Sequence, residues 1–159
     1  MGFMYNNSMI NFHPFSGHPN SIAPGKSRTS GMTPAIIYKD GRPVLIIGAP
    51  GATRIITSVV QVILNVLDFD MSAADAVHAA RFDCQSDLIR CQMRIPEMVC
   101  AKVREKHAIE YVAQSHGGLG LVHAITIDPV TGELAGGADT GAGGMAMEIR
   151  DDGTVGVSG

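Results

Sequence analysis

Val44-Leu-Ile-Ile-Gly-Ala-Pro-Gly-Ala-Thr-Arg-Ile-Ile56 is the stretch from which the fold can be worked out. Its first four residues predict a buried strand, residues 48–52 predict a tight turn, and Thr53 begins a helix. Such a junction directs backbone N–H groups and the positive end of a helix dipole to one point, where an anion or a developing oxyanion would be stabilised. Strand–glycine–helix turns are also common connectors, and this one fits neither a P-loop nor a GxGxxG fingerprint. The turn alone therefore assigns no function.

The helix after the turn is expected over about residues 53–67. Its polar residues recur at three- and four-residue steps and form one narrow stripe: Arg54, Thr57, Ser58, Gln61, Asn65 and Asp68. Branched aliphatic side chains cover the rest of its surface. So wide an apolar surface predicts a helix that is sandwiched inside the protein.

The other elements alternate between short strands and short helices. Two apolar runs on either side of Asp40-Gly41 predict a hairpin. Ser72 is a predicted N-cap for a short helix to about residue 80, and Pro96 precedes a second helix to about residue 106. Further strands are expected at 88–93, 109–112, 121–127, 134–138, 145–149 and 155–157. This order predicts an α+β fold with an antiparallel sheet covered by helices.

Length and composition favour a single domain over residues 1–159. Residues 1–34 are rich in Pro, Gly, Asn and Ser, so an irregular, loop-like segment is expected there. The net charge is -3 and the basic residues are scattered, which excludes nucleic acid as a partner. No apolar run is long enough to span a membrane, and residues 1–7 carry no basic targeting region.

The sequence shows no pattern for a metal or a cofactor. Cys84, Cys91 and Cys100 have no CxxC spacing and leave at least one thiol unpaired, and the six His form no HExxH motif. We therefore expect no metal site and no cofactor. Unpaired thiols favour a reducing compartment.

Three ordered motifs nevertheless point to one family. Asn6-Asn-Ser-Met-Ile-Asn-Phe12 is followed by Pro24-Gly-Lys-Ser-Arg-Thr-Ser-Gly-Met-Thr-Pro34 and then by the junction at residues 48–56. Together with Ala73–Arg81 and Gly132–Asp139, they resemble the small subunit of gamma-glutamyltranspeptidases over nearly the whole chain. The resemblance implies a partial αββα four-layer sandwich of the N-terminal nucleophile hydrolase type. It also implies cleavage of gamma-glutamyl amides, as in glutathione-like substrates, by an N-terminal Thr that passes the acyl group to water or an amine.

The resemblance also assigns roles to five residues. Gly51 and Ala52 match paired glycines whose backbone N–H groups form the oxyanion hole, with Ala52 in place of the second glycine. Ser30 and Gly31 match a Ser-Ser pair that holds the substrate α-carboxylate, and Gly31 lacks the second hydroxyl. Asn11 matches an Asp that binds the α-ammonium, and it lacks the charge that strengthens such a bond. Arg54 is expected to orient the loop.

Family members begin the small subunit with a Thr-led strand pair, whereas here Met1 stands almost at the first motif. The chain alone is therefore expected to be inactive, and its expected partners are the large subunit and the front of the small subunit. Exposed sheet edges would favour a homo-oligomer. Two alternatives stay open: an acylase for another amide, such as a glutaryl group, which has no α-ammonium and so fits Asn11, and a non-catalytic homologue or interaction module. Family members are often exported, so the compartment is open as well.

Overall fold

The computed structural model describes residues 2, 5–113 and 118–157, and the chain divides into two compact units, Met1–Gly31 and Met32–Gly159. The single domain expected over residues 1–159 stays a prediction.

The first unit is built from loops that its own polar groups hold together. Its one regular element in the described residues is the 3₁₀ turn η1 (Ser8–Asn11). Ser21 is buried, and its hydroxyl accepts a hydrogen bond from the His18 N–H at 2.9 Å and donates one to the Phe15 carbonyl. These bonds close the loop over residues 15–21.

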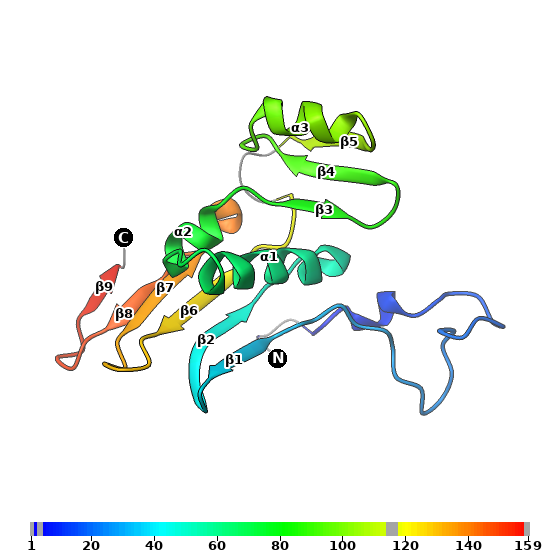
Figure 1. Ribbon diagram of the computed structural model, residues 1–159. Helices are drawn as coiled ribbons and strands as arrows, with labels where there is room; N and C mark the ends of the chain where they lie inside the picture. The colour runs from blue at the N-terminus through cyan, green and yellow to red at the C-terminus, as the bar shows by residue number, and fades with distance from the viewer. Residues whose placement is uncertain (1, 3–4, 114–117, 158–159) are drawn as a thin grey trace. The chain divides into compact units, whose positions relative to one another are not determined.

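The second unit contains a four-stranded antiparallel sheet in the order β1-β2-β6-β7 (Figure 1). The strands are β1 (Ala35–Lys39), β2 (Arg42–Gly48), β6 (His123–Ile127) and β7 (Leu134–Ala138). The predicted turn between β1 and β2 is present, with Asp40 at φ 52° and Gly41 at φ 76°. Left-handed backbone at both positions is the geometry of a two-residue hairpin.

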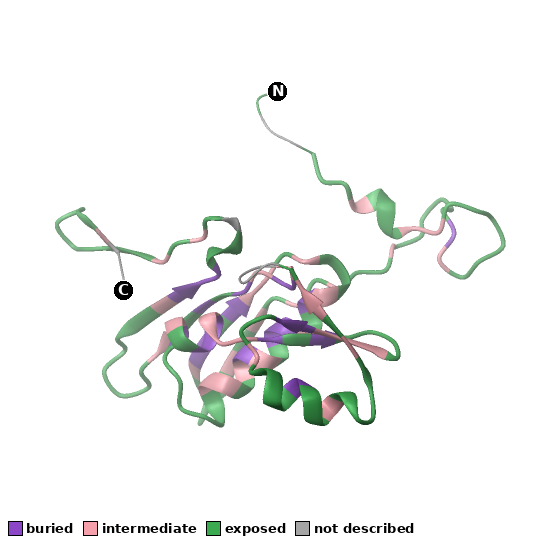
Figure 2. Cartoon of the chain, turned by 90° about the horizontal axis from the view of Figure 1, so that it is seen from above, coloured by how far each residue is buried: buried purple, intermediate pink, exposed green. Residues whose placement is uncertain are grey.

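Helices α1 (Ile55–Leu67) and α2 (Ala73–His78) cover one face of this sheet (Figure 1). Figure 2 shows buried stretches on the strands of this sheet, and the two helices contribute the buried residues Ile55, Ser58, Val59 and Val62 from α1 and Ala73, Ala76 and Val77 from α2. The core contains Leu45, Ile47, Ile55, Val59, Val62, Ala76, Val77, Val122 and Ala124. The predicted cap is confirmed, since the Ser72 hydroxyl accepts from the Asp75 N–H at 3.1 Å.

The expectation that α1 is sandwiched inside the protein is wrong for this unit. Only one side of α1 is buried, while Ile56, Val60, Leu64 and Leu67 are 40–50% exposed on the other. The polar stripe, in contrast, faces protein. The Thr57 hydroxyl donates to Asp83 at 2.7 Å, and the Gln61 amide donates to the Phe82 carbonyl at 2.7 Å. In the described residues, α1 thus presents its hydrogen-bonding side to neighbouring elements and leaves an apolar side uncovered.

Two smaller sheets complete the second unit. Strands β3 (Phe82–Cys84), β4 (Leu88–Gln92) and β5 (Ala108–Val112) form one sheet, in which β4 and β5 are parallel and connected through α3 (Glu97–Arg104). Strands β8 (Met147–Ile149) and β9 (Val155–Val157) form a hairpin. The sequence did not predict β3, because three residues with a polar centre show no alternation that can be recognised.

Candidate active site

The predicted junction after β2 is a tight turn that enters α1 through the 3₁₀ turn η2 (Ala52–Arg54). Gly51 has φ 149° and Ala52 has φ 53°. Within the part of the chain that the structure describes, neither the Gly51 nor the Ala52 N–H donates a hydrogen bond. Gly51 is partly buried and Ala52 is exposed. Two consecutive backbone donors are therefore available to a ligand.

Gly51 is required by its conformation and by its neighbour. A Cβ atom on Gly51 would lie 2.6 Å from the Gly120 Cα, so no other residue fits without moving the backbone. Gly120 is equally constrained, because its own Cβ would lie 2.9 Å from both side-chain heavy atoms of Ser58. The turn thus lies directly against a second glycine from a distant part of the chain.

Hydrogen bonds hold the segment around Gly120 against the turn. The Leu121 N–H donates to the Pro50 carbonyl at 2.9 Å, and the Gly120 N–H donates to the Ser58 hydroxyl at 3.0 Å. Arg54, which was expected to orient the loop, donates from Nη1 to the Gly118 carbonyl. The turn is therefore fastened to residues 118–121 on both sides of Gly51.

A buried ion pair lies behind this segment. Arg81 is fully buried, and its Nη2 lies 2.5 Å from Asp139 Oδ2 and 3.2 Å from the Gly120 carbonyl oxygen. The sequence contained both residues in motifs of the resemblance but indicated no role for either. Neither residue type predicts burial, so no local signal could have revealed this contact.

The other three predicted site residues, Asn11, Ser30 and Gly31, lie in the first unit. Asn11 ends η1 and is exposed, and in the described residues its side chain makes no hydrogen bond. Its carbonyl accepts from the Thr29 hydroxyl at 3.2 Å and from the Asn20 amide. The segment that contains Asn11 is thereby linked to Thr29, the residue before Ser30.

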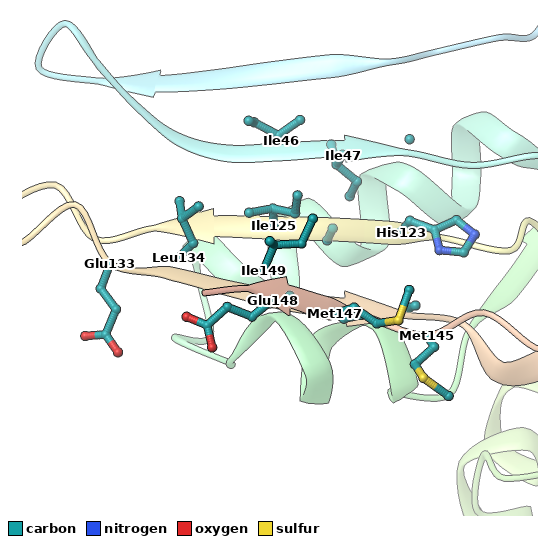
Figure 3. Close-up of a pocket in the computed structure, with 16 residues that line it drawn as sticks. Ile46, Ile47, His123, Ile125, Glu133, Leu134, Met145, Met147, Glu148 and Ile149 are labelled. Carbon is teal, nitrogen blue, oxygen red and sulfur yellow. The ribbon is translucent and has the colours of Figure 1, made fainter. Parts of the chain in front are cut away.

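A groove of about 970 Å³ lies elsewhere, on the sheet face opposite α1 and α2 (Figure 3). Apolar side chains from β2, β6, β7 and β8 line it, among them Ile46, Ile125, Leu134 and Ile149, and Glu133 and Glu148 stand at one end. Neither Gly51 nor Ala52 lines this groove. Sequence reasoning did not anticipate it, because it depends on where β8 lies over the sheet.

The described residues include no cluster of three or more His, Cys, Asp or Glu side chains that could hold a metal ion. In the same residues, no helix combines the length and the apolar character that crossing a bilayer requires. Both findings concern only the ranges given above.

Comparison with known proteins decides the family. The sequence profile of the family described as gamma-glutamyltranspeptidase matches residues 1–149. This chain belongs to the gamma-glutamyltranspeptidase family. The acylase ACY 1 proenzyme of Pseudomonas sp. (strain SE83) is 36% identical over 149 residues, which cover 93% of this chain and 26% of that protein. The glutathione hydrolase proenzyme of Bacillus subtilis (strain 168) is 34% identical over 150 residues, covering 94% of this chain and 25% of that protein.

The gamma-glutamyltranspeptidase of Helicobacter pylori, solved as a T380A mutant, superposes with a TM-score of 0.76 at 33% identity over 87% of this chain and 81% of that chain. The expected α+β class of the N-terminal nucleophile hydrolase type, with antiparallel sheet covered by helices, is thereby confirmed. This gamma-glutamyltranspeptidase-family chain spans about a quarter of the length of the curated relatives it matches.

Proposed function

We propose that this chain supplies the oxyanion-stabilising turn of an enzyme that cleaves gamma-glutamyl amide bonds, as in glutathione-like substrates. The observation that carries the proposal is the Gly51–Ala52 turn, which has two consecutive N–H groups without a partner in the described residues and is fastened to Gly120 beside it. The family membership supports the same reaction. The nucleophilic Thr lies outside this chain in the proposed enzyme.

In the proposed reaction, the Thr hydroxyl attacks the gamma-carbonyl carbon while the Thr α-amine takes the proton. The carbonyl oxygen becomes an oxyanion and accepts hydrogen bonds from the Gly51 and Ala52 N–H groups. The Thr ammonium then passes its proton to the nitrogen of the leaving group, the C–N bond breaks, and the tetrahedral intermediate collapses to an ester on the Thr hydroxyl oxygen. Water or an amino acceptor attacks this ester and releases the acyl group. Each oxyanion donor of this kind contributes ~3 kcal/mol to lowering the barrier.

Asn11, Ser30 and Gly31 are proposed to hold the head group of the substrate. The Ser30 hydroxyl and the Gly31 backbone would bind the α-carboxylate, and the exposed Asn11 side chain would accept a hydrogen bond from the α-ammonium. An amide accepts a weaker bond from a cation than a carboxylate does. We therefore expect weak affinity for the α-amino group.

A hybrid enzyme tests the proposal. The matching quarter of the Bacillus subtilis glutathione hydrolase is replaced by this chain, and the hybrid is assayed for self-cleavage and for release of the aniline from a gamma-glutamyl anilide. We expect a cleaved, active hybrid whose Gly51→Ala variant loses at least a hundredfold in kcat. A hybrid that folds but neither cleaves itself nor releases product would refute the proposal.

An acylase that acts on a glutaryl or a similar side-chain amide is the second candidate. The neutral, exposed Asn11 favours it, since such an acyl group carries no α-ammonium. The similarity to an acylase proenzyme also supports this second candidate. Asn11→Asp in the hybrid separates the two: it should raise the gamma-glutamyl rate at least fivefold if the substrate carries an ammonium, and it should lower the rate with a glutaryl anilide.

A non-catalytic homologue is the remaining candidate, because three of the five family positions differ here: Asn11, Gly31 and Ala52. In that case the hybrid would fold without activity, and reverting all three residues to the family's Asp, Ser and Gly would restore turnover. The coding sequence upstream of Met1 gives a second discriminator, since a Thr-led strand pair there favours the enzyme.

A further inference from the structure

A buried ion pair in the second unit has no function in the reaction proposed above. The Arg81 side chain is fully buried, and that of Asp139 is 4% exposed. Burying two charges has a desolvation cost that their attraction often fails to exceed, so such a pair is weak evidence for stability alone. Its contacts give a more specific role.

The Arg81 guanidinium joins three segments that are distant in the sequence. Its Nη1 donates to the Val77 carbonyl near the end of α2, and its Nη2 donates to Asp139 Oδ2 after β7 and to the Gly120 carbonyl at 3.2 Å. Asp139 is itself held in place, because its Oδ1 accepts from the Gly141 N–H at 2.8 Å. The guanidinium therefore presents a fixed donor to Gly120.

Gly120 transmits this placement to the turn. Its carbonyl oxygen accepts a hydrogen bond from Arg81, and its N–H donates one to the Ser58 hydroxyl. Its Cα packs so closely against Gly51 that a Cβ on Gly51 would lie 2.6 Å from it. A displacement of Gly120 toward the turn is thus opposed by direct backbone contact, and a displacement away from it breaks the bond from the Leu121 N–H to Pro50.

We propose that Arg81 and Asp139 are positioning residues, which set the direction of the Gly51 and Ala52 N–H groups through Gly120. As a catalytic role this rests on the proposed function of the turn, whereas as a structural coupling it can be measured without substrate. The pair acts on the turn rather than on the substrate, since its contacts are with Gly120 and the segments beside it.

The test uses the ¹⁵N-labelled chain and the Asp139→Asn variant, which keeps the side-chain shape and removes the charge. We expect the amide resonances of Gly51, Ala52 and Gly120 to shift and hydrogen exchange at the Leu121 amide to speed up at least tenfold. Exchange at the sheet amides of Ile46 and Ile125 should stay within twofold. The matched control is Glu110→Gln, which breaks the exposed Arg90–Glu110 pair (3.2 Å) and should leave all six amides unchanged.

The proposal would be overturned if the Asp139→Asn chain folds and its Gly51 and Ala52 resonances do not shift. It would also be overturned if hydrogen exchange speeds up equally at every protected amide, because that result indicates a general loss of stability. Should Asp139→Asn unfold the chain, Arg81→Lys, which keeps the cation, takes its place. Unfolding of both variants also counts against the proposal, because the pair would then support the whole core.

The same substitution in the hybrid enzyme addresses catalysis. Asp139→Asn should lower kcat at least tenfold and leave KM within twofold, because an oxyanion contact is made in the transition state. A hybrid that is inactive before any substitution refutes the proposed function, and the amide measurement still decides the coupling.

Discussion

At the scale of single residues, the two proposed oxyanion donors differ in how well they suit their backbone. Gly51 at φ 149° occupies a conformation that other residues avoid, and Ala52 at φ 53° occupies the left-handed region in spite of its Cβ. A residue with a Cβ that adopts this region raises the conformational free energy of the folded chain by roughly 1–2 kcal/mol. Hydrogen bonds from Leu121 to Pro50 and from Arg54 to Gly118 hold the turn in this conformation.

Ala52→Gly should relieve the strain. The gain at φ 53° is partly offset by the greater freedom of glycine in the unfolded chain, so we expect the free energy of unfolding to rise by about 0.5 kcal/mol. The matched control is Ala49→Gly, whose φ is negative and where glycine should cost about 1 kcal/mol. Urea unfolding measures both, and a loss of stability in Ala52→Gly would contradict the assignment of strain.

Cys91 should be protected from thiol reagents. Its burial, followed by the neighbouring Cys100 thiol, raises the pKa of Cys91 from 9.0 to about 11. Because the thiolate is the reactive form, its fraction near neutral pH falls about a hundredfold. In the folded chain at pH 7.5, iodoacetamide should therefore alkylate the exposed Cys84 first and Cys91 at least a hundredfold more slowly.

In denaturant, mass spectrometry should find Cys84 and Cys91 alkylated at similar rates, since burial no longer acts. The folded-state rate at Cys91 should rise as the pH increases from 9 towards 11, where the thiol loses its proton. Equal rates at Cys84 and Cys91 in the folded chain would show that β4 opens freely.

At the scale of elements, α1 shows which patterns can be interpreted locally. The 3.6-residue period of its polar stripe correctly predicted the helix, because that period depends only on the helix itself. Which way the polar stripe faces depends on the elements that pack against α1. Thr57, Ser58 and Gln61 face Asp83, Gly120 and Phe82, which come from other parts of the chain. Periodicity contains no information about those partners.

Two valines on opposite sides of α1 give a direct test of its orientation. Val59 is 1% exposed in the core and Val60 is 47% exposed. Val59→Ala should lower the free energy of unfolding by about 2 kcal/mol through lost burial and a cavity, and Val60→Ala should change it by less than about 0.5 kcal/mol. Denaturant titration of both variants measures the difference. Equal losses would mean that the exposed side of α1 is covered in solution.

Two element boundaries in the structure differ from those expected from the sequence, each for an identifiable reason. The helix expected from Thr53 begins as α1 at Ile55, because η2 occupies residues 52–54. The strand expected over residues 121–127 begins as β6 at His123, since Leu121 donates to Pro50 in the site turn instead of joining the sheet. Both shifts occur where the chain leaves regular structure to build the turn.

At the scale of the whole molecule, the chain corresponds to about a quarter of its relatives, and its apolar sheet face and α1 side are open in the described residues. We expect the isolated chain to release no measurable product from a gamma-glutamyl anilide over hours, because it spans only about a quarter of its relatives' length and the proposed reaction takes its nucleophile from the rest. Absorbance of the released aniline measures this, with the Bacillus subtilis enzyme as the positive control. Turnover by the purified chain would contradict the proposed division of the site.

Most of the helices and strands, the α+β class and, through three ordered motifs, the family could be inferred from the sequence alone, whereas β3 could not. Steric limits on short segments and hydrogen bonds between near neighbours determine where helices and strands form, so these elements leave a pattern in the sequence. It takes the folded structure to show that Gly120 lies against Gly51, that Arg81 pairs with Asp139 behind it, and that the polar side of α1 faces neighbouring elements. These contacts join segments far apart in the chain, and their positions follow from packing that no local pattern encodes.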